Sequence, residues 1–140
     1  MKTHFLQKLL LGCLLASLVG CSSSGPCGQS SLTLGEAKSG SIIKVNSGES
    51  FVIILEGNPT TGYTWELDAL DPAILQQQGE PDFTPDSDAI GSGGKFTFRF
   101  QAISAGQSPL KLIYHRPWEK DVPPLKTFEL LVIVKIQNAE

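Results

Sequence analysis

Histidine and cysteine, on which many nucleophilic and metal-dependent enzymes rely, are scarce in this sequence. Its 140 residues include two histidines and three cysteines, and no G-x-S-x-G motif occurs. His4 and Cys13 lie in an apolar N-terminal segment, which leaves His115 as the only histidine of the remaining chain. A serine triad or a cysteine–histidine pair needs a base beside its nucleophile. We therefore expect that the protein is not an enzyme.

Patterns for binding metals, phosphates or nucleic acids are also lacking. Asp82, Asp86 and Asp88 form a loose acidic segment that we expect to be solvated, and no metal or cofactor is predicted. The segment GSGGK does not match a phosphate-binding loop, because Ala89 replaces its first glycine and Phe96 its Ser or Thr. Without the leader described next, nine basic residues face fourteen acidic ones, a formal charge of −5. This balance argues against binding to nucleic acid.

No apolar run is long enough to span a bilayer as a stable helix. The longest N-terminal run, Leu9–Gly20, follows Lys2 and Lys8 and has the proportions of an export signal. We predict that residues 1–20 are a signal peptide.

The signal ends in the sequence LVGC, Leu18–Cys21, which resembles a bacterial lipobox. That resemblance implies cleavage before Cys21 and lipidation of its thiol, with residues 21–30 as a flexible tether. Ser22 is not the aspartate of an inner-membrane retention signal, so we favour an outer-membrane anchor in the cell envelope. Soluble secretion, with cleavage at the small-x-small site in residues 16–18, is the alternative.

Cys27 is the only other cysteine left after the signal, so it has no partner for an internal disulfide. We expect an exposed thiol in the tether, with a cross-link between two molecules as the alternative. Residues 31–140 are enough for one domain with a modest core. We expect this domain to be a monomer.

The remaining chain shows β-strand patterns. Short runs rich in β-branched residues are bounded by Gly and Ser, and in GKFTFRFQA the residues Phe96, Phe98 and Phe100 alternate with polar ones. Turn signals recur about every ten residues, which predicts an all-β, antiparallel sandwich of about seven strands. An eight-stranded barrel is the alternative. A turn or two of helix after Pro72 is the only helix signal.

Three unusual connections are predicted to share one end of the sandwich, provided that consecutive strands alternate in direction. They are the segments 57–62, 86–94 and 115–124. The prediction requires a strand between Trp65 and Ile90. Because that segment is polar and contains Pro81, we expect a poor edge strand there.

The first connection, GNPTTGYTW, is stiff. Pro59 fixes its own φ, the following threonines are restricted at χ1, and Gly62 can adopt a positive φ. A stiff loop loses little entropy on binding, although a rigid turn without a role is the alternative. Trp65 alternates with Thr64 on the following strand, and we expect it in the core.

The other two connections are weaker signals by themselves. Gly91–Gly94 permits close approach to another surface or a tight entry into a strand. Trp118 follows the rigid Pro117 and Arg116, and Trp and Arg are enriched at binding hot spots. The alternative is a Trp118 folded back on the sandwich with Arg116 stacked over it.

The three motifs N-P-T-T-G-Y-x-W, G-x-G-G and R-P-W occur in this order at Asn58–Trp65, Gly91–Gly94 and Arg116–Trp118. Together they resemble the chagasin-like inhibitors of cysteine peptidases. The resemblance extends from about Leu32 to Ile136. It implies an immunoglobulin-like fold for the predicted sandwich.

The resemblance also implies reversible inhibition of papain-like cysteine peptidases. Pro59–Gly62 would enter the catalytic cleft and cover the active cysteine without a covalent bond, while the other two motifs grip either side. The peptidase-binding residues that it implies are Asn58, Pro59, Thr60, Thr61, Gly62, Tyr63, Gly91, Ser92, Gly93, Gly94, Arg116, Pro117 and Trp118. The alternative is a lipid-anchored immunoglobulin-like module for binding or envelope assembly, with a non-peptidase partner.

Overall fold

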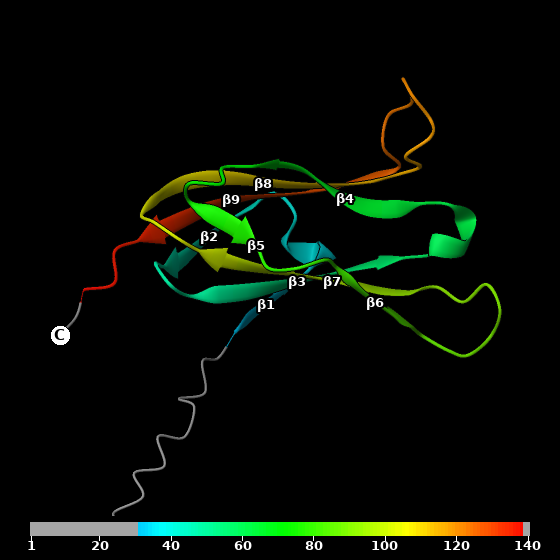
Figure 1. Cartoon of the computed structure of the whole chain (residues 1–140), viewed down its shortest axis with the longest axis horizontal. Helices are drawn as coiled ribbons and strands as arrows, with labels where there is room; N and C mark the ends of the chain where they lie inside the picture. The colour runs from blue at the N-terminus through cyan, green and yellow to red at the C-terminus, as the bar shows by residue number, and fades with distance from the viewer. Residues whose placement is uncertain (1–30, 139–140) are drawn as a thin grey trace, which may run out of the picture.

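Two β-sheets packed face to face form the domain (Figure 1). A computed structural model describes residues 31–138. The predicted signal peptide, the tether, Cys21 and Cys27 lie outside the described residues.

The described chain contains nine strands and two short 3₁₀ helices. In chain order these are β1 (Leu32–Gly35), η1 (Glu36–Lys38), β2 (Ser41–Asn46), β3 (Ser50–Gly57), η2 (Pro59–Thr61), β4 (Thr64–Leu70), β5 (Leu75–Gln77), β6 (Asp82–Pro85), β7 (Gly94–Ala102), β8 (Gly106–His115) and β9 (Lys126–Lys135). One sheet has the order β1-β3-β7-β5, with β6 also pairing with β7, and the other has the order β2-β9-β8-β4. The predicted all-β class is confirmed.

The two edge pairs β1–β3 and β2–β9 are parallel, whereas the prediction was an antiparallel sandwich. The difference follows from the chain path. β1 and β3 lie in one sheet, and β2, which lies between them in sequence, belongs to the other. β1 and β3 run in the same direction along the chain path, as do β2 and β9, so each pair is parallel when its strands become neighbours. The sheets are therefore mixed.

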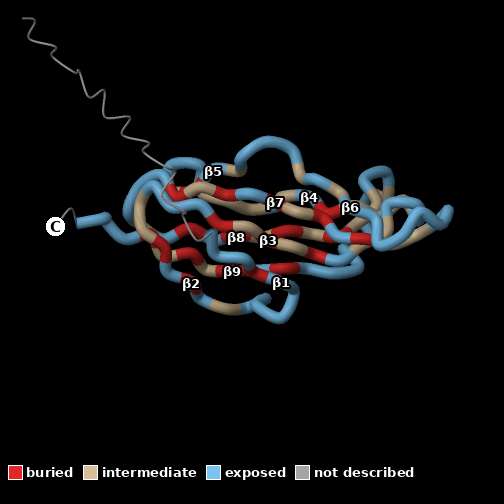
Figure 2. The backbone as a smooth tube through the Cα atoms, turned by 90° about the horizontal axis from the view of Figure 1, so that it is seen from below, coloured by how far each residue is buried: buried red, intermediate tan, exposed pale blue. Residues whose placement is uncertain are grey.

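Alternating apolar residues supply the core. In β7 and β8 every second side chain is buried, and Figure 2 shows the buried positions along the inner strands. Phe98 and Phe100 are almost completely buried and stack with ring centroids 6.4 Å apart. The core face predicted for Phe96, Phe98 and Phe100 is confirmed. Trp65 is likewise buried, as predicted.

The poor edge strand expected before Ile90 is present as two short strands. β5 and β6 both pair antiparallel with β7, so they run in the same direction and act as one interrupted strand. Gly79 and Pro81 lie in the interruption, where Pro81 has no N–H to donate. The helix considered after Pro72 does not form: the amide of Ile74 donates to Asp71 O (3.1 Å) in a turn, and β5 follows at once.

The sandwich has two distinct ends. Loop 1 (residues 58–63), loop 2 (86–93) and loop 3 (116–125) lie at the right-hand end of Figure 1, which we call the loop pole. The opposite end, which we call the turn pole, carries the short turns at 47–49, 71–74 and 103–105. Within residues 31–138 no helix has the length and apolar character needed to cross a membrane.

Candidate functional site

The three predicted loops meet at one end of the molecule. β3, β6 and β8 run into loops 1, 2 and 3, and the antiparallel pairing of β3 and β6 with β7 fixes their directions. The shared location of these loops is therefore a consequence of strand order, as the sequence predicted. Hydrogen bonds between the loops then fix how they lie relative to one another.

Loop 1 is a capped 3₁₀ turn. Asn58 Oδ1 accepts hydrogen bonds from the backbone N–H of Thr60 (3.0 Å) and from its hydroxyl (2.6 Å). Pro59 begins the turn, and Gly62 ends it in the left-handed region at φ 84°. Asn58 therefore acts as an N-cap. The turn presents Pro59, Thr60 and Thr61 at the surface, where all three are exposed.

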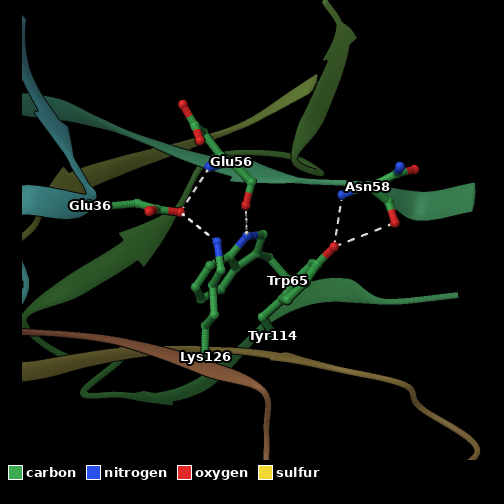
Figure 3. A network of polar contacts seen from close by, with 6 residues as sticks. All are labelled: Glu36, Glu56, Asn58, Trp65, Tyr114 and Lys126. Carbon is green, nitrogen blue, oxygen red and sulfur yellow. Dashed lines mark hydrogen bonds and ion pairs between the residues drawn. The ribbon is translucent and has the colours of Figure 1, made fainter. Parts of the chain in front are cut away.

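Asn58 also connects loop 1 with loop 2 and with the core. Its side-chain Nδ2 donates to Gly91 O in loop 2 (2.9 Å). Its backbone N–H donates to the hydroxyl of Tyr114 (2.7 Å), and that hydroxyl also lies 3.4 Å from Asn58 O (Figure 3). Asn58 is thus tied to segments 33 and 56 residues away in sequence.

The network around these contacts extends into the sandwich (Figure 3). Trp65 Nε1 donates to Glu56 O (3.0 Å), which links β4 with β3. Glu36 Oε1 accepts from the backbone N–H of Glu56 (3.2 Å) and lies 3.4 Å from Lys126 Nζ. These contacts therefore connect the two sheets close to the ends of loops 1 and 3.

Arg116 connects loop 3 with loop 1. Its Nε donates to Thr61 O (3.1 Å), and its guanidinium carbon lies 4.4 Å from the centre of the Tyr63 ring. Its Nη1 lies 3.1 Å from Glu119 Oε1. The stacking partner of Arg116 is therefore Tyr63, whereas the alternative sequence interpretation placed Arg116 over Trp118. Its charge is partly compensated within its own loop by Glu119.

Trp118 lies against loop 1 and is still 65% exposed. A Cβ added to Gly62 would overlap the edge of the Trp118 indole. Gly62 therefore meets two requirements at this position: it adopts a positive φ, and it lets the Trp118 ring approach the backbone closely. Trp118 rests on the loop 1 backbone with most of its surface in solvent, and Pro117 beside it is also exposed.

Loop 2 contains both exposed and structural positions. Gly91 is exposed, whereas the neighbouring Ser92 and Gly93 are half-buried, and the Ser92 hydroxyl donates to Gly93 O (2.9 Å). Gly94 belongs to β7 and is buried, and a Cβ there would overlap Thr84 O. Gly94 therefore permits the close approach of β6 to β7 and does not face outward.

Sequence reasoning missed Ile90, whose side chain is fully exposed beside Gly91. An isoleucine at a loop tip between acidic residues and glycines is an unusual exposed apolar group. That local contrast in the sequence was the signal that could have identified it. With Ile90 on loop 2 and Trp118, Val122 and Leu125 on loop 3, the loop pole presents four exposed large apolar side chains.

His115, Asp82 and Asp86, which were considered in the sequence, each lie in a side-chain pair. His115 Nε2 lies 2.6 Å from Glu66 Oε2 on the outer face of its sheet. Among residues 31–138, no three His, Cys, Asp or Glu side chains are grouped so that they could hold a metal ion. Asp82 and Asp86 form surface ion pairs with Arg99 and Lys95.

The loops and the fold agree with a sequence match to one family. Residues 44–132 match the profile of the Chagasin family peptidase inhibitor I42. The match covers more than half of the chain, and the chain belongs to this family.

Individual relatives give the same result. Amoebiasin-1 of Entamoeba histolytica is 32% identical over 107 residues, which cover 74% of this chain and 100% of the relative. Chagasin of Trypanosoma cruzi is 33% identical over 90 residues, covering 59% of this chain and 79% of chagasin. The relatives are protease inhibitors and not enzymes, which confirms the prediction that this chain is not an enzyme.

A solved structure confirms the fold class. The cysteine protease inhibitor EhICP2 from Entamoeba histolytica aligns with a TM-score of 0.67 at 22% identity, covering 74% of this chain and 95% of EhICP2. The domain is therefore an immunoglobulin-like β-sandwich of the chagasin family, and family members of this fold inhibit cysteine peptidases.

Proposed function

We propose that the domain inhibits papain-like cysteine peptidases reversibly by placing loops 1, 2 and 3 over the catalytic cleft. Loop 1 would occupy the cleft with Pro59, Thr60 and Thr61. Ile90 of loop 2 and Trp118 of loop 3 would contact the enzyme on either side. No covalent bond to the peptidase is part of this proposal.

The observation that carries the proposal is the bonding of the three motif loops to one another at the loop pole. Asn58 is bonded to loop 2, and Arg116 bonds loop 3 to loop 1. The loops therefore form one continuous surface. An inhibitor of standard size buries about 1,600 Å² in total with its enzyme, and apolar anchors such as Trp118 supply much of the affinity.

The shape of loop 1 explains why the peptidase would not cleave it. Pro59–Thr61 is a 3₁₀ turn closed by Asn58 and by the Gly62 N–H bond to Pro59 O (3.0 Å). Cleavage would require the turn to open into an extended strand, at the cost of the cap and the turn bonds. A stiff turn also loses little conformational entropy on binding.

Titration of papain with the soluble domain, Gln29–Glu140, tests the proposal. We expect stoichiometric and reversible loss of activity, with intact inhibitor recovered after dissociation. No inhibition at micromolar protein would contradict the proposal and favour a non-peptidase partner for the same surface.

Thr61→Arg separates a contact role from a structural one. Thr61 is exposed at the tip of loop 1, so a bulky charged side chain should obstruct the cleft and leave the fold intact. We expect much weaker inhibition with only a small drop in melting temperature, because the substitution also removes the bond from the Thr61 hydroxyl to Asn58 O (2.6 Å). An equal loss of stability would assign Thr61 a structural role.

A lipid on Cys21 would hold this inhibitor to a bacterial membrane, and we propose the outer membrane. β1 runs toward the loop pole, and Leu32 pairs with Phe51, six residues before the end of β3 at Gly57. The loops therefore lie about 20 Å beyond Leu32 at 3.3 Å per residue. The tether predicted at residues 21–30 has ten residues and would span about 17 Å on average, so the loops would face away from the anchor.

Tryptophan fluorescence can test this orientation independently of inhibition. Of the two tryptophans, Trp65 is buried and Trp118 is exposed at the loop pole. In vesicles carrying the lipidated chain from Cys21 to Glu140, we expect a water-soluble quencher to reach Trp118 as it does in the unlipidated chain of the same length with Cys21→Ser. Quenching by spin-labelled lipids, or a chain that does not partition into vesicles, would contradict the orientation or the anchor.

A further inference from the structure

Asn58 was predicted to contact the peptidase, but its polar groups are turned toward its own protein. Its side-chain oxygen accepts from Thr60, and its side-chain nitrogen donates to Gly91 O. Its backbone N–H donates to Tyr114, and its backbone oxygen accepts from the hydroxyl of Thr61 (2.6 Å). The residue is half-buried. Little remains of Asn58 for a contact with another molecule.

We propose that Asn58 and Tyr114 are positioning residues, which together hold loops 1 and 2 in the arrangement that binds the peptidase. The proposal rests on the proposed function for the identity of the partner. It assigns these two side chains no contact with the enzyme.

The Tyr114 side chain is held in place by the core. It is only 5% exposed, and its ring packs on Trp65 and Tyr63 with centroids 5.2 and 5.3 Å apart. Lys126 Nζ lies 5.8 Å from the ring centre. Because the ring is held by the core, its hydroxyl is a fixed point for the backbone of Asn58 (Figure 3).

The Asn58 side chain connects loop 1, whose backbone is held by Tyr114, to loop 2. Loop 2 is closed by bonds of its own, from Asp86 N to Gly93 O (2.9 Å) and from Ser92 N to Ala89 O (3.0 Å). These bonds shape loop 2 but do not set its distance from loop 1. The bond from Asn58 Nδ2 to Gly91 O joins the two loops directly next to the exposed Ile90.

Loop 3 is held through different atoms. Arg116 donates to Thr61 O and stacks on Tyr63, and Asn58 takes part in neither contact. Loss of the Asn58 amide should therefore release loop 2 and leave loop 3 in place. This difference separates positioning by Asn58 from a general loosening of the loop pole.

Asn58→Asp is the matched substitution. Aspartate keeps the oxygen that caps loop 1 but cannot donate to Gly91 O, and its charge would face that carbonyl oxygen. One lost hydrogen bond corresponds to about three- to tenfold in affinity. We expect a three- to tenfold weaker inhibition of papain, and a similar effect of Tyr114→Phe. Ser47→Ala is the control, because it removes one side-chain hydrogen bond, to Ile103 O (2.8 Å), at the opposite pole and keeps the bond between loops 1 and 2.

Hydrogen exchange in the free protein distinguishes positioning from contact. In Asn58→Asp we expect faster exchange in loop 2, read at the hydrogen-bonded amides of Asp86 and Ser92, with the strand amides unchanged. Weaker inhibition without faster exchange would make Asn58 a contact residue, and unchanged inhibition with faster exchange would make the bond irrelevant to binding. If even the wild-type chain does not inhibit papain, the proposed function fails, while the exchange result still decides whether Asn58 holds loop 2.

Discussion

The two poles of the sandwich are closed in different ways. At the turn pole, the chain reverses through short turns, which are joined to one another by bonds such as those from Ser47 Oγ to Ile103 O (2.8 Å) and from Gly48 N to Ala102 O (2.8 Å). At the loop pole, the connections are longer and are held by bonds across 33, 55 and 56 residues. Long-range bonds hold both poles, and the poles differ in what they expose: Ile90 and Trp118 of the loop pole are 106% and 65% exposed, whereas Ile103 of the turn pole is 41% exposed. The loop pole is therefore the better suited of the two for binding another molecule.

The poles share one core, and its disruption should have the largest effect. Phe98 lies on the central strand β7 and is 1% exposed. Phe98→Ala should lower the free energy of unfolding by about 3–5 kcal/mol through lost burial and a new cavity. Urea denaturation measures this value. A loss below about 1 kcal/mol would show that the core does not depend on this face of β7.

At the loop pole, Trp118→Ala should change binding and leave folding nearly unchanged. The indole is mostly exposed and rests on the backbone of Gly62. We expect a loss of at least about 2 kcal/mol in binding to papain, measured as the inhibition constant. Val122→Ala, an exposed apolar position on the same loop, is the control. Unchanged inhibition by the folded Trp118→Ala variant would remove Trp118 from the site.

Two glycines provide a matched pair between the poles. Gly62 and Gly48 have similar left-handed φ values of 84° and 88°. A Cβ on Gly62 would overlap Trp118, whereas nothing lies within 4 Å of one on Gly48. Each alanine should cost about 1–2 kcal/mol in stability through backbone strain. Only Gly62→Ala should also weaken inhibition, and an equal loss of inhibition by Gly48→Ala would erase the distinction between the poles.

Glu49 at the turn pole should have the smallest effect. Hydrogen bonds from the backbone and side chain of Asn46 hold the pKa of Glu49 below its ordinary value of 4.5. The carboxylate therefore stabilises the fold above pH 4.5, and this contribution disappears as the pH falls through the lowered pKa. Glu49→Gln should slightly lower the melting temperature at pH 7. The difference should vanish in acid, and inhibition should not change; a difference that persists in acid would rule out this charge effect.

The core strands and the shared end of the three loops were predictable from the sequence. Phe96, Phe98 and Phe100 show the period of two directly, and strand alternation brings the loops to one pole. The parallel edge pairs were not predictable in this way. β1 has four residues and a weak pattern, and its pairing depends on a crossing between sheets.

Within the site, the motifs indicated the loops but not the role of each residue. Asn58, Gly62 and Gly94 owe their identity in part to neighbours that are distant in sequence: Gly91, Trp118 and Thr84, respectively. Contacts of this kind form only when the sheets are assembled. A motif read along the chain therefore mixes exposed residues with residues that hold them in place.

Hydrogen exchange of the complex with papain tests most directly whether the loop pole covers the catalytic cleft. We predict slower exchange at the amides of Thr60, Thr61 and Gly62 in loop 1, in loop 2 around Gly91, and at Trp118. The turns at 47–49 and 103–105 should exchange as in the free protein. Protection at the turn pole, or unchanged exchange in all three loops while papain is inhibited, would contradict the account.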